Sequence, residues 1–169
     1  MRISVEQFLE QVAQRGSWMG GGSVAALSAA LSAALLEKLV VDPRAVRRLR
    51  RMWRECLALI NRDATTFARV IQATRTKNRA TFRRSLKLAI DVPRRVFEHA
   101  CTVQMACRAA ERAVKPSLHS DLRCARALAH AASESARALI ETNLRWLGDP
   151  AYAARIRRQL TAARHADAR

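Results

Sequence analysis

The twenty residues from Ser17 to Leu36 contain no charged side chain, and this run constrains the fold more than any other part of the sequence. Its three glycines, four serines and many alanines make it too weakly hydrophobic for a membrane span. Glu6 and Glu10 precede it, where a signal peptide would carry basic residues. Small side chains on every face allow close neighbours on several sides. The run therefore predicts a helix at the centre of a bundle or in a subunit interface.

Apolar residues recur every three or four positions through the rest of the chain, and no segment alternates as a strand would. A chain of 169 residues has the length of one ordinary domain. We therefore predict an all-α fold: one domain of residues 1–169, a bundle of about six or seven helices with a buried Ala-rich central helix. The predicted helices span about 5–16, 23–41, 43–72, 81–90, 93–114, 120–147 and 150 onward.

Local signals indicate where these helices begin and end. A capping box starts at Ser4, and Ser23 is expected to cap the Ala-rich helix. Asp42 stands before a proline that suits a first helical turn, and Ser120 is expected to cap a later helix. Val92 precedes another proline, which disfavours helical geometry at Val92 and predicts a break there.

The chain is strongly basic, with 31 Lys and Arg against 14 Asp and Glu and a net charge of +17. Such a field concentrates polyanions, which include nucleic acid, anionic membranes and small substrates with several carboxylates. The charge is spread over every predicted helix, and no motif that reads nucleic acid accompanies it. Nucleic acid is therefore not favoured as the partner, and a solvated basic surface is the alternative.

The four cysteines lie in apolar helical stripes, and none forms a Cys-x-x-Cys pair: Cys56, Cys101, Cys107 and Cys124. This usage predicts small buried side chains in a reducing, cytoplasmic compartment rather than a disulfide scaffold. The four histidines are scattered without the spacing of metal ligands, so no metal site is expected.

Three glycines, Gly20, Gly21 and Gly22, stand directly before Ser23 at the start of the Ala-rich helix. Bare backbone N–H groups, the helix dipole and a hydroxyl group converge there and could hold an anion or a carbonyl oxygen. The alternative is a tight loop in which the glycines let the backbone approach neighbouring helices.

Asp63 interrupts the apolar stripe of the helix predicted over 43–72, at a position where one more core residue is expected. An unpartnered buried carboxylate is costly, so Asp63 must pair with an arginine or face a cleft. A structural salt bridge and a role in a site are both open at this point.

Four further polar residues are candidates for a site, each with a structural alternative. Asp121 follows the predicted Ser120 cap and could serve catalysis or only the helix start. Asn143 lies on an apolar seam, where a buried amide needs partners. Lys77 and Arg79 lie in a basic turn that could receive substrate carboxylates or simply be solvated.

These motifs resemble the C-terminal family of formiminotransferase-cyclodeaminase, which includes stand-alone methenyl-tetrahydrofolate cyclohydrolases. The resemblance extends over nearly the whole chain, and the glycine-serine-alanine helix start is its most specific part. The residues that carry it are Phe8–Leu9, Gly20–Leu27, Asp63–Ala64 with Phe67, Val92–Pro93, Ser120–Leu122 and Asn143–Leu144.

The resemblance implies an all-α homodimer without membrane attachment, whose substrate is a tetrahydrofolate derivative and which holds no tightly bound cofactor. The implied reaction is hydrolysis of methenyl-tetrahydrofolate to formyl-tetrahydrofolate, or the related cyclodeamination of formimino-tetrahydrofolate. A carboxylate can stabilise the cationic one-carbon unit and accept a proton from water. The candidates are Asp63 and Asp121 for catalysis, and Gly20, Gly21, Gly22, Ser23, Asn143, Lys77 and Arg79 for substrate binding.

Two positions depart from the pattern of the family. Met19 stands where a proline usually precedes the glycines, and Leu139 stands where the first of two late asparagines is usual. These departures motivate an alternative, a non-catalytic relative that serves as a folate-binding or partner subunit. A basic helical protein that binds nucleic acid is the third hypothesis.

Overall fold

The computed structural model describes residues 3–165, and within them the chain forms six α-helices, one short 3-10 turn and no strand. This confirms the predicted all-α class; the ends of the predicted domain, residues 1–2 and 166–169, lie outside the described residues. The elements are α1 (Val5–Ala13), α2 (Gly21–Leu39), α3 (Pro43–Arg75), α4 (Arg79–Ala110), the 3-10 turn Pro116–Leu118, α5 (His119–Leu147) and α6 (Pro150–His165).

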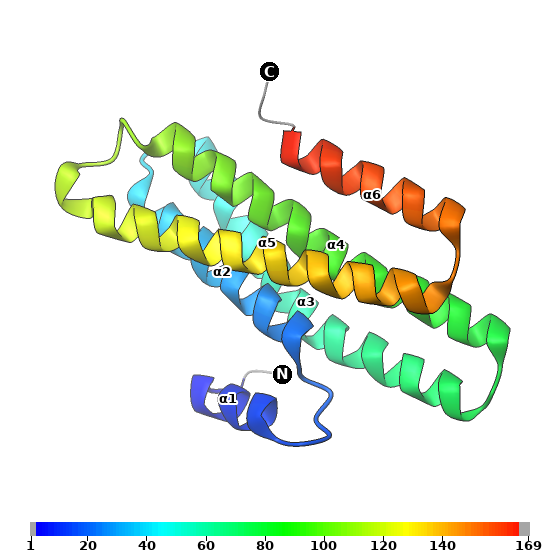
Figure 1. Cartoon of the computed structure of the whole chain (residues 1–169). Helices are drawn as coiled ribbons and strands as arrows, with labels where there is room; N and C mark the ends of the chain where they lie inside the picture. Colours follow the sequence, from blue (N-terminus) through cyan, green and yellow to red (C-terminus); the bar gives the residue numbers. More distant parts are fainter. Residues whose placement is uncertain (1–2, 166–169) are drawn as a thin grey trace.

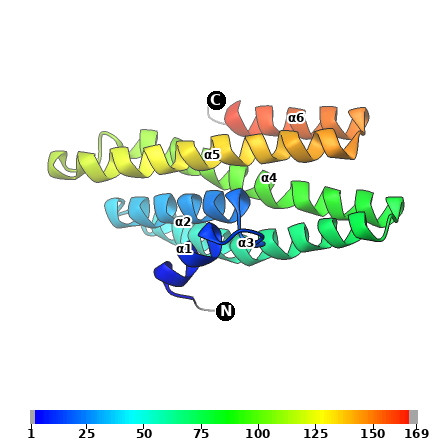
Figure 2. The same ribbon diagram turned by 60° about the horizontal axis from the view of Figure 1, so that its bottom comes forward.

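The four long helices, α2 to α5, lie roughly side by side and form the bundle (Figure 1). Helix α2 packs against α3, α4 and α5, whereas α6 packs along α4. Helices α1 and α6 lie on opposite sides of the bundle, as the second view also shows (Figure 2). The start of α2 meets the middle of α3, where Ser23 contacts Asp63.

Helix α2 is the buried Ala-rich helix that the uncharged run predicts. Ala26, Ala29, Ala33 and Leu36 are fully buried on the side that faces the other long helices. The buried Ser32 hydroxyl donates a hydrogen bond to a backbone carbonyl of α5 at 2.6 Å, which fixes the two helices at close range. Small side chains permit this approach because they keep the helix axes near one another.

By length and composition, α2 is also the one helix in residues 3–165 that could span a membrane. The expectation that its composition is too weakly hydrophobic for a span is therefore wrong. More than half of its apolar window is buried within the bundle, as in the core helix of a folded domain.

Of the four predicted caps, those at Ser4 and Asp42 are confirmed. At the start of α1, the Ser4 hydroxyl accepts a hydrogen bond from the Gln7 backbone N–H at 3.1 Å. The Gln7 side chain accepts one from the Ser4 backbone N–H at 2.9 Å, which completes the capping box. The Asp42 carboxylate caps α3 by accepting hydrogen bonds from the backbone N–H groups of Arg44 and Ala45.

Two other predicted caps are wrong. Helix α2 begins at Gly21 with Gly20 as its N-cap, so Ser23 lies inside the first turn, where its hydroxyl serves another partner. Helix α5 begins at His119, because the 3-10 turn leads directly into it, and Ser120 therefore does not cap it.

The break predicted at Val92 is also wrong, because α4 continues through Pro93. Proline has no N–H, so the carbonyl of Ala89, four residues earlier, loses its helical partner. The Asn143 side chain of α5 donates a hydrogen bond to that carbonyl at 3.1 Å. A residue fifty positions away in the sequence thus replaces the missing bond and makes a continuous helix tolerable.

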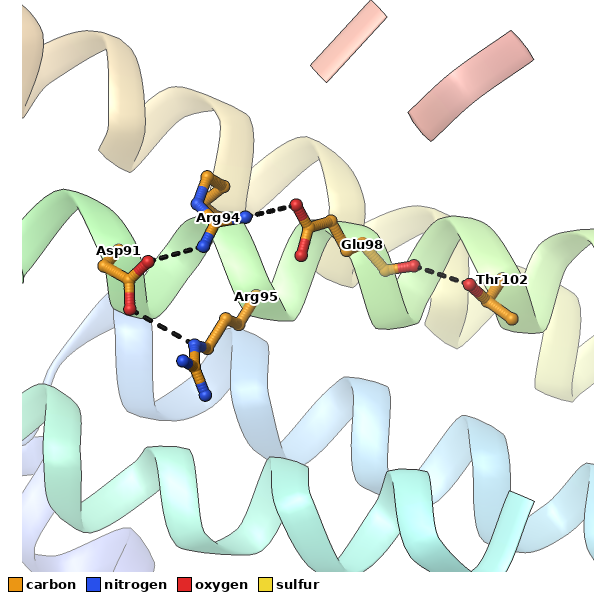
Figure 3. Close-up of polar contacts among 5 residues, drawn as sticks. All are labelled: Asp91, Arg94, Arg95, Glu98 and Thr102. Carbon is orange, nitrogen blue, oxygen red and sulfur yellow. Dashed lines mark hydrogen bonds and ion pairs between the residues drawn. The ribbon is translucent and has the colours of Figure 1, made fainter. Parts of the chain in front are cut away.

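Partly exposed ion pairs along α4 support the same segment (Figure 3). Arg94 pairs with Asp91 and with Glu98, and Arg95 pairs with Asp91 at 3.2 Å. Pairs spaced three and four residues apart stabilise a helical turn. This network spans the turn on each side of Pro93.

Three cysteines fulfil the expectation of burial: Cys56, Cys101 and Cys107. Burial raises the pKa of the Cys56 thiol to about 12 and that of Cys101 to about 11, so both remain protonated at neutral pH. Cys124 is exposed, which contradicts the expectation for that residue, because it lies on the outer side of α5.

Candidate active site

The Asp63 side chain of α3 lies against the first turn of α2. Its Oδ2 atom accepts a hydrogen bond from the Ser23 hydroxyl at 3.0 Å, and the carboxylate also accepts one from the Ser23 backbone N–H. Ser23 itself is fully buried. Asp63 therefore satisfies a helix start that has no side-chain cap of its own.

The glycine at position 22 is required by space rather than by backbone conformation. A β-carbon built on Gly22 would lie 2.1 Å from Oδ1 of Asp63, far inside contact distance. The corresponding atom on Gly21 would meet only a side-chain carbon of Leu139, at 3.8 Å. The bare backbone of Gly22 thus allows the carboxylate to approach the helix start.

The electrostatic environment of Asp63 opposes ionisation. Burial raises the pKa of the Asp63 carboxyl above its ordinary value of 3.8, and the two hydrogen bonds from Ser23 offset only part of this effect. No lysine or arginine within residues 3–165 forms a salt bridge with Asp63. Of the two sequence-based alternatives, an arginine pair or a cleft, the structure has the cleft.

That cleft is a cavity of about 230 Å³ between α2, α3, α4 and α5. Asp63 and the three glycines form part of its wall. Trp18, Phe67 and Trp146 line it as well, and all three are partly open to solvent. The rings of Trp18 and Phe67 meet edge to face, with centroids 6.3 Å apart. The arrangement suits a flat ligand that places a polar or cationic atom near the carboxylate.

Asn143 lines the same cavity, so the sequence-based candidate lies beside Asp63 and the glycines. Its amide nitrogen is engaged with the Ala89 carbonyl, which gives it the structural role described above. Leu139 also lines the cavity, whereas the Met19 side chain is buried in the core. Of the two departures from the family pattern, only Leu139 therefore changes the wall of the cavity directly.

Three sequence-based candidates do not meet Asp63 within one chain. Asp121 pairs with Lys38 at 3.1 Å near the other end of α2, roughly 24 Å from Gly22 at the usual helical rise. Lys77 and Arg79 line a separate hollow of about 210 Å³ at the turn between α3 and α4. That turn lies beyond Arg75, roughly 18 Å along α3 from Asp63.

Two tryptophans line the cavity but were not predicted from the sequence as site residues. Trp18 stands two residues before the triple glycine, and Trp146 stands three residues after Asn143, one helical turn away. Helical spacing from Asn143 is the signal that could have found Trp146, whereas Trp18 lies in the loop and is marked only by its nearness to the glycines. Within residues 3–165, no group of three or more His, Cys, Asp or Glu side chains could hold a metal ion.

The chemical capacity of the site follows from its one carboxylate and from the helix start beside it. A carboxylate with a raised pKa is a stronger base than an ordinary one, and it can also balance an adjacent positive charge. The backbone N–H groups at the start of α2 carry partial positive charge and suit an oxygen that gains negative charge. Such a site can move a proton beside a cationic carbon.

Comparison with known proteins supports the resemblance seen in the sequence. The family model for formiminotransferase-cyclodeaminase matches residues 4–42 and 43–162. A solved structure, formiminotetrahydrofolate cyclodeaminase from Thermotoga maritima, superposes with a TM-score of 0.88 at 23% sequence identity. That match covers 96% of this chain and 88% of the other. A comparison with curated proteins finds no match. Because the family model matches nearly the whole chain, the protein belongs to the formiminotransferase-cyclodeaminase family.

Proposed function

We propose that the protein is a folate one-carbon enzyme that hydrolyses methenyl-tetrahydrofolate to formyl-tetrahydrofolate. The observation that carries the proposal is the Asp63 carboxylate, which forms no salt bridge with the described residues and lies between the triple glycine and an aromatic-walled cavity. The family membership supports a folate substrate, and the Thermotoga neighbour is itself named for activity on formiminotetrahydrofolate.

In the proposed reaction, water adds to the cationic carbon that bridges two folate nitrogens. A C–O bond forms while one proton of the water passes to the Asp63 carboxylate. One C–N bond then breaks, and the same proton moves to the departing nitrogen. The second water proton is released from the added oxygen to solvent, which leaves a neutral formyl group on the other nitrogen. The N–H groups of Gly21 and Gly22 would stabilise the oxygen as it gains charge. General base catalysis of this kind contributes about 10²- to 10⁴-fold to the rate.

The related cyclodeamination uses the same parts in another order. An N–H nitrogen of folate attacks the formimino carbon and loses its proton as the bridging C–N bond forms. The C–N bond to the former imino nitrogen then breaks, and that nitrogen leaves as ammonia after it receives a proton. Asp63 in its protonated form would supply that proton, which its raised pKa favours. A single carboxylate beside the one-carbon unit thus suits both reactions, and hydrolysis is the one that we put forward.

Loss of the methenyl chromophore in the presence of purified protein tests the proposal directly. We expect hydrolysis well above the rate in buffer, and a loss of about 10²- to 10⁴-fold on Asp63→Asn. A folded protein that hydrolyses methenyl-tetrahydrofolate no faster than buffer would reject it. Release of ammonia from formimino-tetrahydrofolate, measured in parallel, separates the two reactions.

A second candidate is a family relative that binds folate without turning it over. Leu139 favours it, because this residue puts an aliphatic side chain on the cavity wall where the family usually has an amide. Calorimetric binding of tetrahydrofolate without turnover would support this candidate. Restoration of turnover by Leu139→Asn would show that the aliphatic side chain is the cause.

The anionic glutamate tail of folate has no basic partner among the residues that line the cavity. Lys77 and Arg79 lie at the α3–α4 turn instead, so we propose that the overall charge of +17 draws the substrate in. A folate enzyme of this kind would work in the cytoplasm, with tetrahydrofolate as substrate and no resident cofactor.

We also propose that two copies of the chain pair through the outer face of α2. This face carries the α2 stripe, an apolar row of residues Val24, Leu27, Leu31 and Leu35. Val24 is 39% exposed and Leu31 is 50% exposed, in a helix whose other side forms the core. A second copy that presents the same stripe would cover it symmetrically.

A further inference from the structure

The residues that line the Asp63 cavity differ from the rest of the chain in charge and in tryptophan content. Among the described residues that line it, Asp63 is the one charged residue, although the chain contains 31 lysines and arginines. Two of the chain's three tryptophans line this one cavity. A small cavity that combines a carboxylate with aromatic rings, and that lacks basic side chains, matches a cation and not an anion.

The aromatic side chains reach the cavity from three separate elements. Trp18 belongs to the loop before α2, Phe67 to α3 and Trp146 to α5. Their exposed fractions are 46%, 39% and 54%. Large rings normally contribute to stability by being buried, so rings left open beside a cavity offer surface to a ligand.

The third tryptophan, Trp53, differs from the other two because both its N–H group and its ring face have partners within the protein. The Trp53 indole N–H donates a hydrogen bond to the Glu37 carboxylate at 2.7 Å. The Arg54 guanidinium lies over the Trp53 ring, 5.2 Å from its centroid. No cation–π contact to Trp18 or Trp146 occurs within residues 3–165. The two rings at the cavity therefore remain available to a cation from outside.

We propose that the Asp63 cavity recognises a planar, delocalised cation, which contacts the rings of Trp18, Phe67 and Trp146 with Asp63 as its counter-ion. The substrate is then selected by the positive charge of its one-carbon unit and not by its anionic tail. The identity of the natural ligand, which would be the bridged amidinium of methenyl-tetrahydrofolate, rests on the proposed function. The recognition of a planar cation does not, because it follows from the lining of the cavity.

Calorimetric titration of the full-length protein with benzamidinium and with benzamide tests this inference. The two probes have the same shape and differ in charge. We expect benzamidinium to bind at least about tenfold more tightly, and Asp63→Asn to remove that preference. Trp18→Leu and Trp146→Leu should each weaken benzamidinium binding by about three- to tenfold, in line with cation–π energies. Equal affinity for the two probes would overturn the inference.

Trp53→Phe is the matched control, because it removes an indole that lies outside the cavity. It should leave benzamidinium affinity unchanged. Trp18 and Trp146 are about half exposed, so their substitution should leave the fold intact, which circular dichroism checks. Wild-type affinity in both leucine variants would overturn the role of the rings even if charge selectivity persists.

A parallel assay separates this inference from the proposed function. Selective binding of benzamidinium without any hydrolysis of methenyl-tetrahydrofolate would reject the function and retain the cation site. Hydrolysis without selectivity between the two probes would reject the cation site and retain the function. Titration with methenyl- and 5-formyl-tetrahydrofolate, which share a tail but differ in charge at the bridge, extends the comparison to the natural substrate class.

Discussion

At the scale of single residues, Asp63 has two tasks. It supplies the hydrogen-bond acceptor that the start of α2 lacks, and it forms the charged part of the cavity wall. The first task stabilises its ionised form through Ser23, and burial has the opposite effect. The balance raises the pKa of the carboxyl, which is the condition that a general base needs.

Asp63→Asn should therefore separate stability from activity. Above the folded-state pKa, the ionised carboxylate is disfavoured by burial, so a neutral amide that still accepts from Ser23 should keep or increase the free energy of unfolding. Hydrolysis should fall by about 10²- to 10⁴-fold. Urea unfolding at pH 7 and the chromophore assay check the two effects, and a markedly destabilised variant would contradict the first.

The pH dependence of the wild type follows from the same group. The folded protein holds a proton on Asp63 at pH values where the unfolded chain, with its ordinary pKa of 3.8, has lost it. The free energy of unfolding should therefore gain a contribution as the pH falls through the folded pKa toward 3.8. Over the same range kcat/KM for hydrolysis should fall, because the protonated carboxyl cannot accept a proton. Asp63→Asn should remove the contribution of this residue to the stability profile.

Gly22→Ala is expected to be far more damaging than Gly21→Ala. A methyl group at Gly22 would overlap Asp63 Oδ1, which forces the carboxylate or the helix start to move, at a cost of about 1–3 kcal/mol or more. A methyl group at Gly21 meets only Leu139, at an ordinary contact distance of 3.8 Å, and should stabilise the helix by about 0.5 kcal/mol. Urea unfolding of the two variants provides the measurement, and equal effects would show that the close approach is not rigid.

Site residues could be predicted from the sequence where they interrupt a hydrophobic pattern, and could not be predicted where they fit an ordinary one. Asp63 stood out because an acid interrupted an apolar stripe, and the structure does place it beside the triple glycine. Trp18 and Trp146 could not be found in this way, because an isolated tryptophan on a helix or loop is ordinary. Asp121, which follows a predicted cap, was a candidate beside Asp63, yet it lies on a different part of the bundle, which only the tertiary packing determines.

At the scale of elements, the continuity of α4 depends on its neighbour α5. Pro93 leaves the Ala89 carbonyl without a helical donor, and the Asn143 amide supplies one at 3.1 Å. The residue that lines the cavity is thus also the residue that allows the helix behind the cavity to pass through a proline. Helix integrity and cavity shape are coupled at this one hydrogen bond.

A double-mutant cycle between Pro93 and Asn143 measures this coupling. Asn143→Leu alone should cost about 1–3 kcal/mol, since it leaves a carbonyl unsatisfied. In the Pro93→Ala background the helix recovers its own N–H donor, so the same change should cost about 1 kcal/mol less. Urea unfolding of the four proteins gives the coupling energy, and additive effects would contradict the account of α4.

Local signals predicted elements well where the determinant was local. The capping box at Ser4 and the Asp42 cap were recognisable because acceptor and donor lie within three residues of each other. The prediction failed at Val92 and at Ser23, where the decisive partner comes from another helix. The helix-breaking tendency of proline and the capping tendency of serine apply to an isolated segment. At Pro93 and Ser23, hydrogen bonds to a distant part of the chain determine the structure instead.

At the scale of the whole molecule, α2 has one face in the core and one face open. The core face holds alanines that let α3, α4 and α5 approach, and the open face carries the α2 stripe. An uncharged run with small residues all round predicted that arrangement in outline, as a bundle centre or an interface. Which of its faces stays open is set by the positions of the neighbouring helices, which the sequence did not specify.

Leu31→Glu tests the pairing proposed for that open face. A charge at the middle of a covered stripe would be buried against the partner, so we expect dimers to dissociate into folded monomers. Val41→Glu is the control, because Val41 is 94% exposed and lies outside the stripe. Sedimentation velocity measures the outcome, and a wild-type monomer at micromolar concentration would dismiss the pairing.

The placement of Asp63 at the start of α2 bears on how such a protein could change over evolutionary time. A lineage that ceased to need turnover would still lose stability if it replaced this side chain with one that cannot accept a hydrogen bond, since the start of the central helix would then lack an acceptor. An aspartate or asparagine at this position can therefore be retained after activity is lost, so an acceptor at position 63 in a descendant is evidence of the inherited fold and not by itself of a working enzyme.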